Sequence, residues 1–136
     1  MEVKVICWAV VEKDGKILLV QEKKEHCKGK WNYPAGRLDL DEDIFSAAVR
    51  EVKEETGLDV ELEGLIGIYQ HKSIRGNCIV MIHFKASVIG GEMKHNEDEL
   101  LDVRWFTPEE MRKLDLRSGD ITQDIRGLEE EGTAPA

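Results

Sequence analysis

Three glutamates are close together on one predicted helix. At about 100° per residue, Glu51, Glu54 and Glu55 of the predicted helix 43–56 fall within roughly a third of its circumference. Apolar residues that should pack against the rest of the protein share this sector. Three carboxylates at such a place repel one another, and burial raises their pKa values. Hard cations such as Mg²⁺ or Mn²⁺ relieve both effects because they prefer carboxylate oxygens. A solvated acidic helix is the alternative that the spacing alone leaves open.

The elements that must position this helix are mostly strands. β-Branched and aromatic residues predict strands over 3–11, 16–21, 59–70, 78–88 and 103–106, and a short strand that breaks into a turn over 31–37. Asp41 or Asp43 caps the start of helix 43–56, and Gly57 stands where a C-terminal cap belongs. A short helix is expected to start at Thr107, and a last helix near 119–130. The pattern predicts an α+β protein, with helices packed on a mixed sheet.

Length and charge exclude several classes of protein. The chain has 136 residues, which supports one domain, and its 28 acidic and 19 basic residues give a net charge of -9. This charge argues against binding to a nucleic-acid polymer. No apolar run approaches the roughly 20 residues that span a membrane, and no signal-peptide pattern opens the chain. Cys7, Cys27 and Cys78 form no disulfide framework. We therefore expect a cytoplasmic protein with one domain over 1–131 and a frayed tail at 132–136.

The residues that flank the glutamates extend the pattern. Residues 36–58 read GRLDLDEDIFSAAVREVKEETGL. This segment resembles the Nudix box, GX5EX7REUXEEXGU with U an apolar residue, at every fixed position. The preceding Trp31-Asn32-Tyr33-Pro34-Ala35 is similar to the strand that enters the box in this family. We therefore interpret the chain as a member of the Nudix, or MutT-like, family.

The resemblance implies a fold and an activity. The fold would be a Nudix-type α/β/α sandwich, with the box helix packed on a mixed sheet. The activity would be that of a pyrophosphohydrolase, dependent on Mg²⁺ or Mn²⁺, acting on a small nucleoside di- or triphosphate or a similar substrate. Pro-Ala-Gly before the box resembles, more weakly, members that act on nucleotides, including oxidised guanine forms, or on thiamine-type pyrophosphates. Homodimers are common in the family. A catalytically silent nucleotide sensor is the alternative, although the intact box speaks against it.

The same resemblance assigns roles within the box. Glu51, Glu54 and Glu55 would ligate the metal, together with the main-chain carbonyl of Ala35. Glu51 is also the best candidate for the general base, and Glu54 shares the catalytic set. Arg50 would orient Glu51 through a charge-assisted hydrogen bond.

Other residues are candidates around this centre. In the acidic run 97–99, Glu99 could supply the base or a further metal ligand, and a solvated loop is the alternative. Gly36 lets the backbone approach a phosphate and a metal, and Arg37 could touch a phosphate. Tyr33 could stack on a base, although aromatic residues of strands more often belong to the core.

Two groups outside the box are expected to carry no function. The loop with Lys23, Lys24 and Lys28 is expected to be solvated rather than to bind substrate. His26 and His71, with two of the cysteines, show no standard zinc spacing.

Overall fold

The fold is known from a computed structural model that describes residues 2–72, 76–117 and 121. The strands are β1 (Val3–Lys13), β2 (Lys16–Glu22), β3 (Trp31–Asn32), β4 (Ala35–Arg37), β5 (Leu58–Lys72), β6 (Cys78–Gly91) and β7 (Leu100–Phe106). The helical elements are a 3₁₀ turn η1 (Glu25–Cys27), the helix α1 (Ile44–Thr56) and the short helix α2 (Pro108–Met111).

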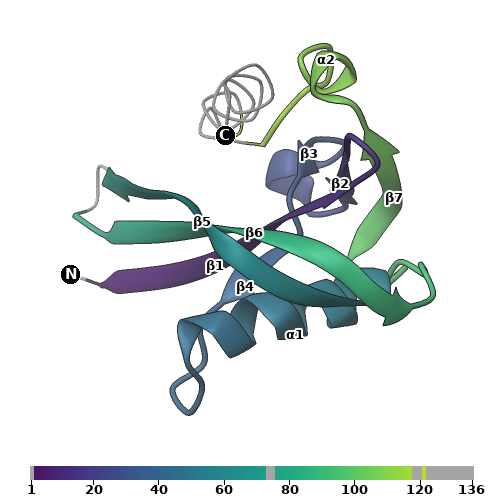
Figure 1. Ribbon diagram of the computed structural model, residues 1–136. Coiled ribbons are helices and arrows are strands. Elements are labelled where there is room, and N and C mark those ends of the chain that lie inside the picture. Colours follow the sequence, from purple (N-terminus) through teal and green to yellow (C-terminus); the bar gives the residue numbers. More distant parts are fainter. Residues whose placement is uncertain (1, 73–75, 118–120, 122–136) are drawn as a thin grey trace, which may run out of the picture.

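The strands form one seven-stranded mixed sheet, whose main path runs β3-β2-β1-β6-β5 (Figure 1). β1 and β6 are parallel, and the other pairs are antiparallel. β1 pairs with β2 only beside their hairpin turn, so the earlier part of β1 is free to pair with β4. In that pairing Gly36 lies opposite Cys7. This local exchange of partners brings the start of the box into the sheet.

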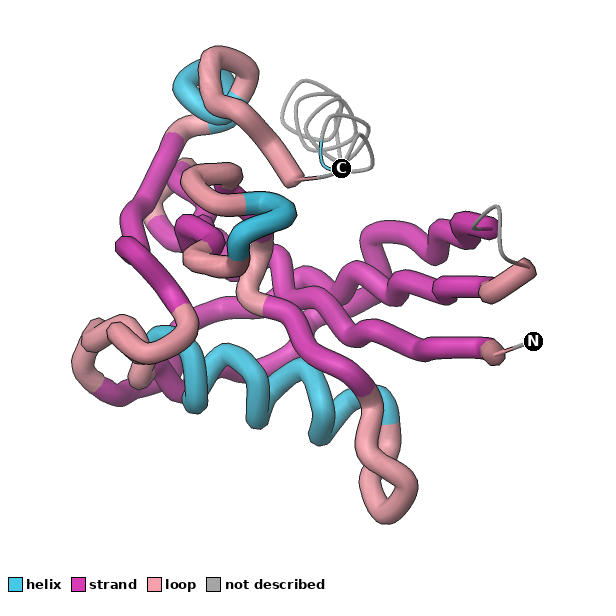
Figure 2. Tube along the Cα trace, turned by 180° about the vertical axis from the view of Figure 1, so that it is seen from behind, coloured by secondary structure: helices cyan, strands magenta, loops and turns pink. Residues whose placement is uncertain are grey.

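The two faces of the sheet carry separate parts of the core. Successive side chains of a strand point to opposite faces. Accordingly, Cys7 packs with Ala47 and Ala48 of α1, whereas Trp8 belongs to a cluster that includes Met111 of α2. Figure 2 shows α1 lying along one side of the sheet and α2 at the other side. The first face therefore holds the helix with the acidic residues.

Local signals set the ends and the buried face of α1. The Asp43 side chain accepts a hydrogen bond of 2.7 Å from the backbone N–H of Ser46, as an N-cap does. Gly57 adopts the left-handed conformation, with φ 78°, and its N–H donates to the carbonyl of Lys53. Ala47 and Ala48 are fully buried, and their small side chains let the helix approach β1 closely.

The sheet and the packed helix confirm the predicted α+β class. Residues 31–37 form two strands rather than one, because Pro34 lacks the N–H that a continuous ladder needs. β6 continues through Gly90 and Gly91, beyond the predicted end of the strand at residue 88. The predicted helix near 119–130 and the tail at 132–136 lie outside the described residues, apart from Ile121. Within those residues, no helix is both long and apolar enough to span a membrane.

Candidate active site

The first half of the site is a contact between β4 and α1. The main-chain N–H of Ala35 donates a hydrogen bond of 2.9 Å to Oε1 of Glu55. A Cβ added to Gly36 would overlap the carboxylate of Glu51. Gly36 has no positive φ, so glycine is required here for space rather than for backbone conformation. Two of the predicted metal ligands therefore lie against the segment that opens the box.

Glu55 is a carboxyl group in an unfavourable place for a negative charge. Its side chain is buried, and the residue is only 6% exposed. Burial raises the pKa of Glu55 to about 9. The Ala35 N–H opposes this rise, whereas nearby carboxylates add to it, namely those of Glu51, Glu22 and Glu99. A bound cation would favour the ionised form at neutral pH.

Arg50 holds the other carboxylates of the box. Its Nε and Nη2 donate to both oxygens of Glu42, over 2.9 and 2.6 Å. Its Nη1 donates to Glu51 over 2.7 Å and to Glu54 over 3.2 Å. The hydrogen bonds from Arg50 lower the pKa of Glu42, while burial raises the pKa of Glu51 in spite of Arg50. The contact expected between Arg50 and Glu51 is thus present, and Glu42 serves to fix Arg50.

The loop that precedes β7 closes the site at the end of α1. The backbone N–H of Asn96 donates to the carbonyl of Glu55 over 3.1 Å, which docks the loop on the helix. Glu99 follows in this loop and is exposed. Its charge raises the pKa values of both Glu51 and Glu55. Glu54 is more open, with 56% of its side chain exposed, and its charge also acts on Glu51.

The donor set fits a hard cation. In the part of the chain that the structure describes, no three His, Cys, Asp or Glu side chains are already gathered as a metal site. However, the available groups are carboxylate oxygens and the Ala35 carbonyl, which are ligands that Mg²⁺ prefers. Glu54 is largely exposed to solvent, whereas Glu55 is buried with its charge disfavoured. The site therefore has both the oxygen ligands for a cation and an electrostatic reason to bind one.

A cleft of about 620 Å³ opens beside Ala35 and Gly36. Apolar residues form part of its wall, among them Trp8 and Met81. Arg37, the candidate for a phosphate contact, lies at the cleft, and its guanidinium pairs with Glu2 over 2.7 Å. Ala35, Gly36 and Arg37 therefore line one cavity.

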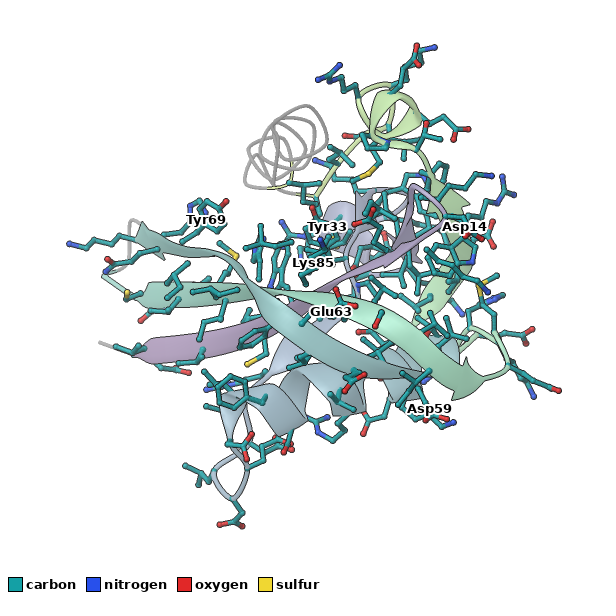
Figure 3. The ribbon with its side chains drawn as sticks, in the orientation of Figure 1. Asp14, Tyr33, Asp59, Glu63, Tyr69 and Lys85 are labelled. Atoms are coloured by element: carbon teal, nitrogen blue, oxygen red, sulfur yellow. The ribbon has the colours of Figure 1, made fainter. Side chains whose placement is uncertain are left out.

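The expectation that Tyr33 stacks on a base requires correction. Tyr33 is fully buried, and its ring packs edge-on against Trp8 and His83. Figure 3 shows Tyr33 on the side of the sheet away from α1, the side on which Tyr69 also lies. Tyr33 lies between β3 and β4 with its ring enclosed in the core, so the ring has no exposed face for a ligand.

Sequence reasoning missed several residues at the cleft. Glu22 ends β2, lines the cleft and raises the pKa of Glu55. Asn32 is buried, and its Nδ2 donates to Glu22 over 3.4 Å. Lys24, expected to be solvated, lies at the rim. Nothing in the local pattern shows that the end of β2 folds back beside the box.

Comparison with known proteins gives a consistent family. A family model described as the NUDIX domain matches residues 2–125. An ADP-ribose pyrophosphatase of Methanocaldococcus jannaschii is 36% identical over 117 residues, covering 85% of this chain and 68% of that protein. The 8-oxo-dGDP phosphatase of Homo sapiens is 36% identical over 125 residues, covering 87% of this chain.

The chain spans only part of some relatives. It covers 37% of the human protein. It also covers 29% of a nudix hydrolase of Caenorhabditis elegans, with 36% identity over 111 residues and 79% of this chain. What the comparisons share is therefore the domain described above.

A solved structure has the same fold. A NUDIX hydrolase from Nitrosomonas europaea matches with a TM-score of 0.85 and 31% identity, over 96% of this chain and 90% of that chain. The sheet, the helix and the box thus agree with the family model. The chain belongs to the Nudix family.

Proposed function

We propose that this protein is a pyrophosphohydrolase that uses Mg²⁺, or Mn²⁺, to cleave a diphosphate linkage in a small nucleotide-like substrate. The observation that carries the proposal is Glu55, a buried carboxyl group that accepts a hydrogen bond from Ala35, and Ala35 itself lines the cleft. Relatives named for ADP-ribose and for 8-oxo-dGDP support the substrate class, because both compounds contain a diphosphate.

Different residues of the chain would bind the metal, accept the proton and orient the base. Glu51, Glu54 and Glu55, with the Ala35 carbonyl and Glu99, would hold the metal, which when bound neutralises phosphate charge and lowers the pKa of water. Glu51 would take the proton from the attacking water, and Glu99 is the alternative base. Arg50 would orient Glu51, since it donates to that carboxylate over 2.7 Å.

Arg37 and the backbone at Gly36 would contact the phosphates. Both residues line the cleft, and Gly36 leaves the backbone uncovered beside Glu51.

We also propose that the domain extends over 1–131 and works in a reducing, cytoplasmic environment. Three free cysteines support the reducing environment. Light scattering on the purified chain would test the homodimer that the family resemblance implies.

Hydrolysis of a substrate panel tests the proposal. The panel should contain nucleoside di- and triphosphates, their oxidised guanine forms, ADP-ribose and thiamine pyrophosphate, each with Mg²⁺ and with EDTA. We expect turnover that EDTA abolishes and a loss of about 100-fold or more in kcat/KM for Glu55→Gln. The exposed Glu61 of β5 provides the control Glu61→Gln.

Two outcomes would contradict the proposal separately. If Glu55→Gln turns over substrate as fast as the parent chain, Glu55 is not a metal ligand. If the folded parent binds Mg²⁺ yet hydrolyses nothing in the panel, the hydrolase proposal fails in favour of a nucleotide sensor.

A further inference from the structure

The cleft has a charge opposite to that of the whole chain. The chain carries 28 acidic and 19 basic residues. Among the residues that line the cleft, Glu22 is the only acidic one. The lining nevertheless includes four lysine and arginine side chains, Lys4, Lys24, Arg37 and Arg117, in addition to His26 and His71. Such a local excess of positive charge attracts an anionic group.

The fold holds these cations in place from separate segments. The loop with Lys24 is closed where the N–H of Glu22 donates to the carbonyl of Lys30 over 2.8 Å. Arg117 is fixed where its own N–H donates to the carbonyl of Trp31 over 2.8 Å. Lys4 lies within β1, paired with β6. The positive rim is therefore built by the loop η1, the segment after α2 and the central strand together.

Among the residues that the structure describes, several of these cations have no acidic partner. Arg37 pairs with Glu2. No described carboxylate lies within ion-pair distance of Lys4, Lys24 or Arg117. Their charges are thus available to a ligand.

The cleft offers little surface for stacking a base. Trp8 is the only aromatic residue with a six-membered ring in the lining, and it is 4% exposed. One face of its indole is covered by His83, with ring centroids 4.4 Å apart. Recognition in this part of the cleft must then depend on charge more than on an aromatic platform.

The cations extend beyond the reach of one diphosphate. Gly36, beside the carboxylates, is paired with Cys7 of β1. Lys4 lies three residues earlier on the same strand, which is roughly 10 Å along it. A diphosphate bound at Gly36 would leave Lys4 for a second group.

We infer that the cleft accepts a substrate whose remaining moiety carries its own phosphate group, in addition to the diphosphate that is cleaved. This inference rests on the proposed function for the position of the scissile diphosphate. The second phosphate lies at the basic rim, where Lys4 and Arg117 bind it by charge-assisted hydrogen bonds, with Lys24 contributing to the field.

Matched substrate pairs test the inference. Adenosine 5′-diphosphate is compared with its 3′-phosphorylated form, and NADH with NADPH, in the parent and in the double variant Lys4→Gln/Arg117→Gln. We expect the parent to favour the phosphorylated member of a pair, and the double variant to reduce that kcat/KM ratio at least about tenfold, mainly through KM. Lys13→Gln is the control on the same strand, because Lys13 is exposed and outside the cleft. This control should leave the ratio unchanged.

A binding measurement separates the inference from the proposed activity. Calorimetry compares adenosine 5′-monophosphate with adenosine 3′,5′-bisphosphate in the presence of Mg²⁺. Tighter binding of the bisphosphate that the double variant abolishes supports the inference even if no substrate is hydrolysed. An equal loss for both members of each pair would mean that these cations hold the scissile diphosphate itself. Unchanged kcat/KM values for both members in the double variant would mean that the rim does not bind a phosphate. Either result overturns the inference.

Discussion

Glu55 is the residue at which the requirements of stability and of metal binding conflict most clearly. It is buried, and its pKa is raised to about 9 mainly by that burial. In the unfolded chain the same group is fully solvated and ionises in its usual range. Folding without a cation therefore costs free energy at neutral pH, which a bound metal would offset.

Replacing Glu55 by glutamine should separate these effects. The amide oxygen of Glu55→Gln can still accept the hydrogen bond from Ala35, and no charge is buried. In EDTA at pH 8 we expect the variant to unfold at a temperature higher than the parent by on the order of 5 °C. Mg²⁺ should raise the Tm of the parent but hardly that of the variant. Calorimetry with Glu61→Gln as control measures both effects, and an unchanged response to Mg²⁺ would count against the ligand role.

Side-chain contacts within α1 could be predicted from the sequence, whereas contacts between segments far apart in the chain could not. The pairing of Arg50 with Glu54 follows from their spacing of four residues on the helix. Arg50 and Glu51 are adjacent in the chain, so their contact was implied by the family resemblance and not by helical spacing. The place of Glu22 and Arg117 at one cleft depends on how β2 and the segment after α2 return to β3. No local pattern carries that information.

At the scale of elements, the contact between β4 and α1 decides the shape of the site. The two elements lie so close that the Glu51 carboxylate occupies the space of a side chain at Gly36. Glu51 is also fixed by Arg50, which limits how far it can move. The spacing between the strand and the helix therefore depends on glycine at this position.

Gly36→Ala should disturb this contact. We expect a loss of about 1–3 kcal/mol in the free energy of unfolding, as for other overpacked sites, and a larger relative loss of activity because Glu51 must shift. Gly64→Ala is the matched control, since Gly64 also lies in a strand, has no positive φ and has open space at its Cβ position. Chemical denaturation and kcat measured on both variants provide the comparison. If the two substitutions have equal effects, the overlap with Glu51 is not what requires glycine.

The elements themselves were largely predictable, whereas their partners were not. β-Branched runs and the caps Asp43 and Gly57 are local signals, and they placed the strands and α1 to within a few residues. The parallel pairing of β1 with β6 joins segments far apart in the chain. Alternation of apolar residues shows which faces are buried, but it does not show which strand is the neighbour.

At the scale of the whole molecule, carboxyl groups of two kinds determine how stability varies with pH. Hydrogen bonds lower the pKa values of Asp43 and Glu110 at the two helix starts, and Arg50 lowers that of Glu42. The stability from these groups is present above their unfolded-state pKa values. It is lost as the pH falls through their lower folded-state values. They therefore protect the fold at neutral pH and weaken it in acid.

Glu55 has the opposite effect, and this gives the last prediction. Its folded-state pKa of about 9 exceeds the ordinary value of 4.5, so the folded protein binds the proton more tightly. Its stabilising contribution is then complete below about pH 4.5 and declines as the pH rises toward 9.

In EDTA we expect the Tm to be highest near pH 5 and to fall by on the order of 10 °C by pH 9. Mg²⁺ should reduce this decline, because a cation binds the ionised carboxylate more strongly as the pH rises. Glu55→Gln should show little decline even in EDTA. Thermal unfolding across this pH range distinguishes the cases, and a flat profile for the metal-free parent would mean that Glu55 is already ionised and neutralised by the protein itself.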